Sequence, residues 1–436
     1  TLRKEKAYDN HRLKTASKNE MIFPASTEEV QEIVRVCAAH HVPIVAFGTG
    51  SSLEGHVNAP AGGISLDFSK MDAILEVHAE DMDAVVQPGV TRKALNTHLR
   101  DTGLFFPVDP GADASLGGMA ATRASGTNAV RYGTMKDNVL ALKAVLPSGE
   151  VLVTGARARK SSAGYDLTRL MVGSEGTLGI ITELTLKLHG VPEAVSAATC
   201  SFPSVQAACD TVIASIQYGL PVARIELLDA LQVRAVNAYS KLSLPEAPLL
   251  LLEFHGSEAS VAEQAGVFGE IAGDHGGTGF EFTTREEERG RLWQARHDAY
   301  WASLALRPGA KGISTDVCVP VSRLADCVTA AQAKTEEMGF VAPGVGHVGD
   351  GNFHVLLLID MEDVAEIARA ERFVGWLNEL AISMGGTCTG EHGIGQGKAA
   401  YLERELGSEA MAVMAAIKAG IDPLNIFNPG KLRLPV

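Results

Sequence analysis

Two histidines flank an Asp-Gly pair in the stretch from Gly346 to His354. Asp-Gly is a strong sequence signature of a two-residue type I′ turn between antiparallel strands. If Asp350 and Gly351 form this turn, His347 and His354 each lie three residues from it and face each other, with Cβ atoms roughly 5 Å apart. The spacing predicts that both imidazoles can bind one divalent metal ion; two surface histidines on a hairpin are the alternative.

A second segment, Thr389 to Gly395, places a carboxylate beside another histidine, between glycines. The glycines let the backbone bend sharply and present Glu391 and His392. Glu391 would complete a two-histidine, one-carboxylate set, which is usual for zinc or manganese with positions open to a substrate. Taken alone, Glu391 and His392 could equally belong to an ordinary polar loop.

Three stretches rich in glycine and small residues occupy the first half of the chain: 48–55, 107–133 and 172–180. Glycines and hydroxyl residues can turn several backbone N–H groups toward one anion and let the backbone approach a flat ligand closely. Neither the dinucleotide fingerprint G-x-G-x-x-G nor the P-loop pattern is present. Three such stretches predict an extended cofactor with a pyrophosphate rather than three plain turns.

Mixed helices and strands must position these motifs. A capping box, in which Ser26 and Glu29 bond each other's backbone amides, predicts the start of a helix. Strands are expected over 42–47, 64–68, 73–77 and 84–87, with a helix over 91–100. After Pro192 the pattern alternates strands (223–228, 249–254) with helices (205–218, 260–272), as in an α+β domain of ferredoxin-like units. A last helix is expected over 408–418.

The chain as a whole resembles the vanillyl-alcohol-oxidase-type flavoproteins, and within them the D-lactate dehydrogenase (cytochrome) family. The matching stretches are 43–55, 87–91, 107–121, 125–133 and 173–182, and the similarity runs from about residue 22 to 431. It implies an α+β fold: a two-part FAD-binding domain (1–192), an α+β substrate or cap domain with a largely antiparallel sheet and the metal site (193–400), and a C-terminal helix and tail (401–436) that return to the FAD domain.

The resemblance further implies non-covalent FAD. The first glycine loop would hold the pyrophosphate, the second would line the flavin and its chain, and Gly179 with Ile180 would close over it. Two residues depart from the family pattern: His56 stands where glycine is expected and Arg123 where a small residue is expected. The implied cofactor-binding residues are Phe47, Gly48, Thr49, Gly50, Ser51, Ser52, Leu53, Pro110, Gly111, Ala112, Ser115, Gly118, Ser125, Gly126, Tyr132, Glu175, Gly179, Ile180 and Asn428.

By the same resemblance, His347, His354 and Glu391 match the metal ligands and His392 the catalytic base. Oxidation of a 2-hydroxy acid removes the hydroxyl proton and a hydride from C2. A metal bound to the hydroxyl and carboxylate lowers the hydroxyl pKa, the base takes the proton, and the hydride passes to flavin N5.

Three more residues are expected near the substrate. Arg296 is the expected bidentate clamp for the substrate carboxylate. Lys311 is a weaker second cation, and Asn352 is expected to orient the substrate or a metal ligand.

These features predict oxidation of a small D-2-hydroxy acid, with D-lactate to pyruvate the best match. D-2-hydroxyglutarate and glycolate dehydrogenases are the sibling alternatives, although a second substrate carboxylate should require more cations than Arg296 and Lys311. A metal-dependent hydrolase would leave the glycine stretches unexplained. A non-catalytic nucleotide-binding module would leave the histidine hairpin unexplained.

Composition limits the partners. With 38 basic and 52 acidic side chains the net charge is −14, which argues against nucleic-acid binding. Six scattered cysteines fit a reducing compartment, and no apolar run approaches the roughly 20 residues of a membrane span. The expected electron acceptor is cytochrome c, a quinone or an electron-transfer protein, and the expected assembly is a homodimer. The expected location is the cytoplasm of a bacterium, including the periphery of its inner membrane, or the mitochondrion of a eukaryote.

Overall fold

The chain folds into two units, which a computed structural model describes over residues 19–434. Unit 1 contains the described residues up to Gly126, Tyr132–Val191 and the segment from Glu391 onward; unit 2 contains Thr127–Arg131 and Pro192–Gly390. Among residues 19–434, no helix is long and apolar enough to cross a membrane.

The limits of the units differ from the expected domains in two places. Residues 391–400 group with unit 1, because the amides of Ile394 and Gly395 donate to the Glu175 carboxylate at 2.7 and 2.8 Å. Residues 127–131 group with unit 2, because Arg131 donates to the carbonyl oxygens of Pro221 and His255. Both exceptions depend on tertiary hydrogen bonds, which the local sequence pattern does not display.

Unit 1 begins with a small parallel sheet in the order β1-β3-β2. Its helix α1 (Thr27–Ala39) starts at Ser26, whose hydroxyl accepts from the Glu29 amide as expected. The returning bond from the Glu29 carboxylate goes to the amide of Ala25 instead of Ser26. The three strands are β1 (Asn19–Ile22), β2 (Ile44–Phe47) and β3 (Gly63–Asp67).

The second sheet of unit 1 is antiparallel, with five strands in the order β4-β5-β9-β7-β8, and the short strands β6 and β10 pair beside it. The strands are β4 (Ile74–His78), β5 (Asp83–Val86), β6 (Leu104–Phe105), β7 (Val139–Val145), β8 (Val151–Val153), β9 (Ile180–Lys187) and β10 (His189–Gly190). The helices between them are α2 (Arg92–Leu99), α3 (Leu116–Thr122), α5 (Met135–Asn138) and α6 (Leu167–Met171), and α4 (Ala129–Tyr132) spans the unit boundary.

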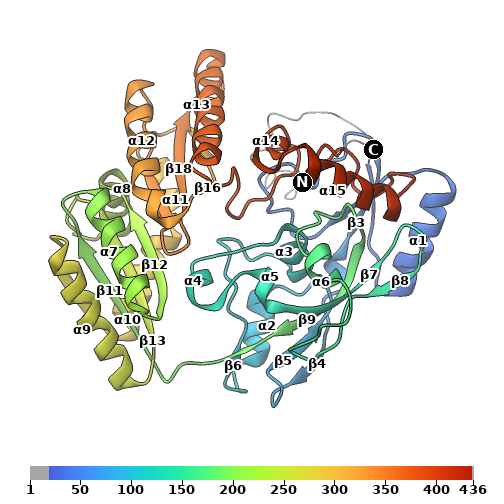
Figure 1. Cartoon of the computed structure of the whole chain (residues 1–436), viewed down its shortest axis with the longest axis horizontal. Helices are drawn as coiled ribbons and strands as arrows, with labels where there is room; N and C mark the ends of the chain where they lie inside the picture. Colours follow the sequence, from blue (N-terminus) through green and yellow to red (C-terminus); the bar gives the residue numbers. More distant parts are fainter. Residues whose placement is uncertain (1–18, 435–436) are drawn as a thin grey trace. The chain divides into compact units, whose positions relative to one another are not determined.

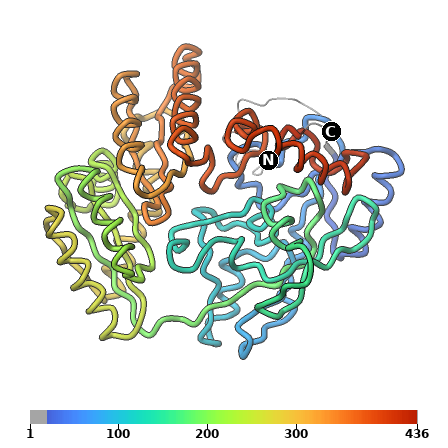
Figure 2. The backbone as a smooth tube through the Cα atoms, viewed as in Figure 1, coloured from blue at the N-terminus to red at the C-terminus, as the bar shows by residue number. Residues whose placement is uncertain are grey.

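The C-terminal segment packs within unit 1 against its first strands. After α14 (Leu402–Leu406) and α15 (Ser408–Ile421), the Ile426 carbonyl accepts from the Ile44 amide at 2.7 Å, and the Asn428 amide donates back to Ile44 at 2.8 Å. Figure 2 shows this red segment returning to the blue N-terminal part of unit 1. Asn428 is thereby held beside the first residue of β2, and its side-chain amide donates to the carbonyl of His56, just after the first glycine loop, at 3.1 Å.

Unit 2 is built on one antiparallel sheet in the order β14-β11-β13-β12-β17-β18-β15, with β16 also paired to β18 (Figure 1). The expected antiparallel sheet is confirmed, and its first four strands follow the ferredoxin-like order. The strands are β11 (Ala194–Ser201), β12 (Val222–Leu228), β13 (Leu249–Gly256), β14 (Thr278–Thr283), β15 (Lys311–Ser314), β16 (Val317–Cys318), β17 (Gly344–His347) and β18 (Asn352–Ile359).

The two faces of this sheet carry different residues. Ile225, Leu250 and Leu252 belong to a large core that also contains residues of four helices, α7 (Val205–Tyr218), α9 (Glu258–Asp274), α12 (Leu324–Glu337) and α13 (Val364–Ser383). On the opposite face, Leu228 and Leu251 pack in a smaller core with α8 (Ala230–Ser240), α10 (Glu286–His297) and α11 (Ala299–Ala305). Because strand residues alternate between faces, Glu226 shares the second face with Leu228.

Candidate functional site

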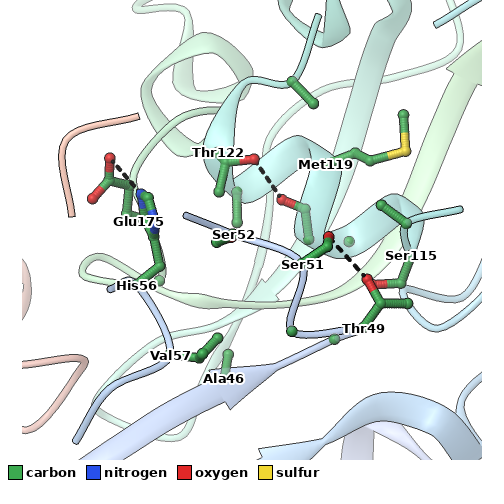
Figure 3. A pocket seen from close by; sticks show the side chains of 18 of the residues that line it. Ala46, Thr49, Ser51, Ser52, His56, Val57, Ser115, Met119, Thr122 and Glu175 are labelled. Atoms are coloured by element: carbon green, nitrogen blue, oxygen red, sulfur yellow. Dashed lines mark hydrogen bonds and ion pairs between the residues drawn. The ribbon is translucent and has the colours of Figure 1, made fainter. Parts of the chain in front are cut away.

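Unit 1 contains a cavity of about 400 Å³, within the range of small-molecule and cofactor sites. The loop after β2, the segment from Pro110 to Ser125, and residues around Glu175 and Gly179 all line it. Glu391, His392 and Asn428 contribute from the C-terminal segment. The three glycine-rich stretches therefore meet around one space, as expected for a shared ligand (Figure 3).

Most of the expected cofactor residues line this cavity. They are Phe47, Gly48, Thr49, Gly50, Ser51, Ser52, Leu53, Pro110, Gly111, Ala112, Ser115, Gly118, Ser125, Glu175, Gly179 and Asn428. Sequence reasoning missed Met119 and Thr122, which lie on α3 at helical spacing from Ser115 and Gly118. That spacing was present in the sequence and could have identified both residues.

Three expected residues do not line the cavity. Ile180 points into the hydrophobic core of unit 1, and its neighbour Ile181 lines the cavity instead, because adjacent residues of a strand face opposite sides. Gly126, at φ +153°, packs against the backbone of Asp109. Tyr132 packs edge-on against Phe105 and His189, with ring centroids 5.5 and 5.0 Å away.

Polar groups in the cavity suit a phosphorylated cofactor. The Ser115 hydroxyl is buried and makes no hydrogen bond to any residue between 19 and 434, although Ser115 caps α3. A Cβ on Gly48 would collide with this hydroxyl, so the absence of a side chain keeps the glycine loop against the start of the helix. The hydroxyls of Thr49 and Ser51 lie 3.3 Å apart on the same loop (Figure 3). A buried hydroxyl beside a backbone loop fits the pyrophosphate of FAD.

The two residues that depart from the family pattern have structural partners in unit 1. His56 Nε2 lies 3.2 Å from Glu175 Oε1, and both side chains are buried (Figure 3). A Cβ on Gly393 would meet both groups, so His56 and Glu175 hold the backbone next to His392. Arg123 ends α3 with a left-handed φ of 57° and donates to the Val172 carbonyl, which supports the third glycine stretch.

His392 brings a titratable group into the cofactor cavity. Its Nδ1 lies 3.8 Å from Glu54 Oε1, and Glu54 also lies 3.6 Å from the Lys398 ammonium. The amides of Gln396 and Gly397 donate to the Glu54 carbonyl. The segment that carries His392 is thus tied to the first glycine loop, so a proton acceptor faces the space where the flavin is expected.

The histidine hairpin has a different register from the expected one. His347 pairs with Asn352 and His354 with Val345, so the loop contains four residues instead of two. A type I′ turn needs positive φ at both central residues, but of the pair Asp350-Gly351 only Gly351 has one, at 81°. The two histidines are therefore diagonal neighbours on one face, with ring centroids 5.5 Å apart. Their proximity was predicted correctly, and the register was wrong.

Hydrogen bonds fix the protons of both imidazoles. His347 Nδ1 lies 2.6 Å from a Glu226 carboxylate oxygen, and His354 Nδ1 lies 2.8 Å from the Thr315 carbonyl. An acceptor at each Nδ1 places the proton there and leaves the lone pair on Nε2, the form in which histidine coordinates metals. The donor set of unit 2 therefore fits a divalent metal ion.

Arg296 lies beside the two histidines, and its guanidinium already binds Glu226. Its Nε and Nη2 donate to Glu226 Oε2 at 2.9 and 2.6 Å. The guanidinium can still bind a substrate carboxylate through Nη1 and the second N–H of Nη2, because this edge is not the one that Glu226 uses. Burial alone would raise the pKa of Glu226, but His347 and Arg296 more than offset it and hold that pKa below its usual value.

Asn352 and Lys311 both lie on the sheet of unit 2, in different surroundings. Asn352 Nδ2 donates to Asp316 Oδ1 and to the Val317 carbonyl at 2.8 Å, so its amide group fixes local structure. Its Oδ1 is buried and accepts no hydrogen bond within the described part of the chain. Lys311, at the start of β15, is exposed.

Asp316 also ties Thr389 and Gly390 to the hairpin. Its Oδ2 accepts from the Thr389 hydroxyl at 2.9 Å, and a Cβ on Gly390 would collide with Asn352. Glu391 directly follows Gly390 in the chain and is the first residue of the C-terminal segment of unit 1. Asp316 and Glu226 were both missed from sequence, where each is only an isolated acidic residue.

Comparison with known proteins agrees with this geometry. A family model of the FAD binding domain matches residues 20–155, and a model of the C-terminal domain of FAD linked oxidases matches residues 191–432. A Danio rerio protein named probable D-lactate dehydrogenase, mitochondrial, is 54% identical over 94% of this chain and 84% of its own length. The chain belongs to the D-lactate dehydrogenase (cytochrome) family of FAD-linked oxidases.

Other comparisons support the same family and fold. The D-lactate dehydrogenase [cytochrome], mitochondrial, of Arabidopsis thaliana is 48% identical over 95% of this chain and 73% of its own length. The solved structure of 4-ethylphenol oxidase from Gulosibacter chungangensis superposes with a TM-score of 0.75 at 20% identity, covering 95% of this chain and 89% of that one. This last likeness concerns the fold alone. The chain is thus an FAD-binding oxidoreductase, as its resemblance to the family predicted.

Proposed function

We propose that the chain is an FAD-dependent D-lactate dehydrogenase that oxidises D-lactate to pyruvate. The observation that carries the proposal is a single cavity lined by the three glycine stretches and by His392. The names of the Danio rerio and Arabidopsis thaliana relatives support D-lactate as the substrate. FAD, held non-covalently in this cavity, would accept the hydride from C2 of the acid.

The proposed metal ligands are His347, His354 and Glu391. The two imidazoles present Nε2 lone pairs on one face of the hairpin, and Glu391 follows Gly390, which packs against that hairpin. Two histidines and a carboxylate suit Zn²⁺ or Mn²⁺ with positions left for a substrate. Such an ion would act as a Lewis acid on the substrate hydroxyl.

The residues of the chain then divide the work on the substrate. His392 takes the hydroxyl proton, because its imidazole lines the flavin cavity and lies next in sequence to Glu391. Arg296 binds the substrate carboxylate through the edge that Glu226 leaves open. Asn352 Oδ1 is an acceptor for a hydroxyl or a bound water in the same region. One monocarboxylate satisfies these groups.

The electrons are proposed to leave bound FAD for cytochrome c, since several relatives carry the word cytochrome in their names. A quinone or an electron-transfer protein is the alternative acceptor, and a homodimer is the proposed assembly. The Danio rerio and Arabidopsis thaliana relatives are named as mitochondrial proteins, so we propose the mitochondrion if the source is eukaryotic and the bacterial cytoplasm or inner-membrane periphery otherwise.

An anaerobic visible spectrum of the purified chain tests the function. D-lactate should bleach the flavin band within the mixing time of a manual experiment, and L-lactate should leave it unchanged. Bleaching by glycolate or D-2-hydroxyglutarate but not by D-lactate would mean that one of these two acids is the substrate instead. A protein that takes up no flavin from added FAD would contradict the proposal as a whole.

The metal ligands are tested by His347→Ala. The affinity of the variant for Zn²⁺ or Mn²⁺ should fall by at least roughly 10- to 100-fold, because one coordinating imidazole is removed. Its flavin content should stay at the wild-type level. Metal content after dialysis against a metal buffer, measured by plasma emission, gives the comparison. His275, which lies at the end of α9, provides the control variant His275→Ala. Equal metal content in wild type and His347→Ala would remove His347 from the ligand set.

A further inference from the structure

Glu226 is a fully buried carboxylate for which the proposed reaction has no role so far. It lies on β12, has no exposed surface, and pairs directly with His347 across the β12–β17 register. Oε1 lies 2.6 Å from His347 Nδ1, and Oε2 accepts two N–H bonds from Arg296. One side chain thus contacts both a proposed metal ligand and the proposed substrate clamp.

We propose that Glu226 is a positioning residue that holds the metal ligand His347 and the substrate clamp Arg296 in their working orientations. The inference rests on the proposed function, because it takes His347 as a ligand and Arg296 as the carboxylate clamp. Glu226 itself contacts neither substrate nor metal; it acts through the two side chains that do.

The hydrogen bond to His347 determines which nitrogen can coordinate. A carboxylate at Nδ1 keeps the proton there, orients the ring, and makes Nε2 a stronger donor to a metal. Without the carboxylate, the imidazole can rotate and exchange tautomers, so a bound ion would first have to order it. Loss of such a partner to a metal-bound histidine typically costs 10- to 100-fold in metal affinity.

The bonds to Arg296 determine which edge of the guanidinium faces the substrate. Glu226 takes the edge formed by Nε and Nη2, so the edge formed by Nη1 and Nη2 is the one left for a second carboxylate. Glu226 also neutralises this guanidinium, whose side chain is only 13% exposed. A single buried anion therefore keeps the arginine in place before the substrate arrives.

The neighbouring strand provides a matched control. Glu253 on β13 is also buried, lies 2.7 Å from His255 Nε2 and 3.5 Å from Arg224 Nε. It shares the composition of the Glu226 group, a glutamate with one histidine and one arginine, on the same face of the sheet. No metal-ligand role is proposed for His255, so Glu253→Gln removes an equivalent buried charge without touching the proposed site.

The experiment uses the full chain loaded with FAD, as Glu226→Gln, Glu253→Gln and wild type. Titration calorimetry with Zn²⁺ and with Mn²⁺ gives metal affinity. A redox-inert carboxylate, oxalate, titrated against the metal-free proteins while the flavin spectrum is followed, gives the affinity of the clamp. Glu226→Gln should lose roughly 10- to 100-fold in metal affinity and at least several-fold in oxalate affinity, whereas Glu253→Gln should match wild type in both.

The outcomes separate this inference from the proposed function. Metal affinity in Glu226→Gln equal to that of wild type overturns the inference and leaves the metal site standing. A wild type that binds neither metal ion overturns the metal site and the inference together. If Glu226→Gln fails to fold with FAD, Glu226→Asp replaces it: the charge is kept, the carboxylate is withdrawn by one methylene, and an intermediate loss of metal affinity is expected. Wild-type affinity in that variant overturns the inference.

Discussion

Replacing His392 with alanine should lower the rate of flavin reduction by D-lactate by about 10²- to 10⁴-fold while FAD stays bound. The imidazole lines the cofactor cavity as one residue among about thirty, so its removal leaves the glycine loops and the buried Ser115 hydroxyl in place. Without it, the substrate hydroxyl has lost its proposed proton acceptor.

Anaerobic stopped-flow reduction of the flavin measures this step apart from the electron acceptor. His98→Ala is the matched control, because His98 is an exposed histidine on α2 of the same unit, and its rate should equal that of wild type. A rate for His392→Ala within a few-fold of wild type would assign proton removal to another group. Loss of FAD in this variant would instead give His392 a structural role in the cavity.

The cofactor cavity was largely predictable from sequence because local composition determines it. Gly48, Gly111 and Gly118 stand in stretches with few large side chains, and the repetition of such stretches in one half of the chain favours a shared ligand over separate turns. Sequence could not show which of two neighbouring side chains on a strand faces the cavity. Ile180 and Ile181 are equivalent in hydrophobicity, and only the pairing of β9 with its neighbours decides which of them faces the cavity.

The histidine hairpin likewise has a strand register that the local sequence did not determine. Its two histidines lie together with or without the expected turn. The change from a two-residue to a four-residue loop shifts the partner of His354 by two residues, from His347 to Val345, and a shift of two keeps both rings on one face. The turn also makes a tertiary contact that the local sequence does not display: the Val319 amide donates to the Gly351 carbonyl at 3.0 Å, and a Cβ on Gly351 would collide with the Val319 carbonyl.

The ion pair between Glu226 and Arg296 could not be predicted from the sequence. They are 70 residues apart, on β12 and α10, and no local pattern pairs them. Arg296 was expected to be the clamp for the substrate carboxylate, with a solvated helix arginine as the alternative. The fold gives it a buried acidic partner first, so only one edge of the guanidinium is left for the substrate.

A side chain added at Gly118 should weaken FAD binding without unfolding the chain. Gly118 lies on α3. Apart from its chain neighbours and the helix backbone, the one atom of residues 19–434 within 4 Å of an added Cβ is the Ser115 hydroxyl oxygen, at 3.2 Å. Gly118→Leu therefore directs its side chain into the cofactor space, and the helix itself gains up to about 1 kcal/mol in propensity. Overpacking of a fitted site costs about 1–3 kcal/mol, which corresponds to roughly 5- to 150-fold weaker FAD binding.

Flavin absorbance per protein after gel filtration, with circular dichroism on the same samples, distinguishes loss of cofactor from loss of fold. Gly266→Leu is the control, since Gly266 lies within helix α9 and nothing lies within 4 Å of its added Cβ. A yellow Gly118→Leu protein with wild-type FAD affinity would mean that the flavin does not occupy the space beside α3. Because Ser115, Gly118 and Thr122 line that space together, the variant tests whether FAD lies against this part of the second glycine stretch.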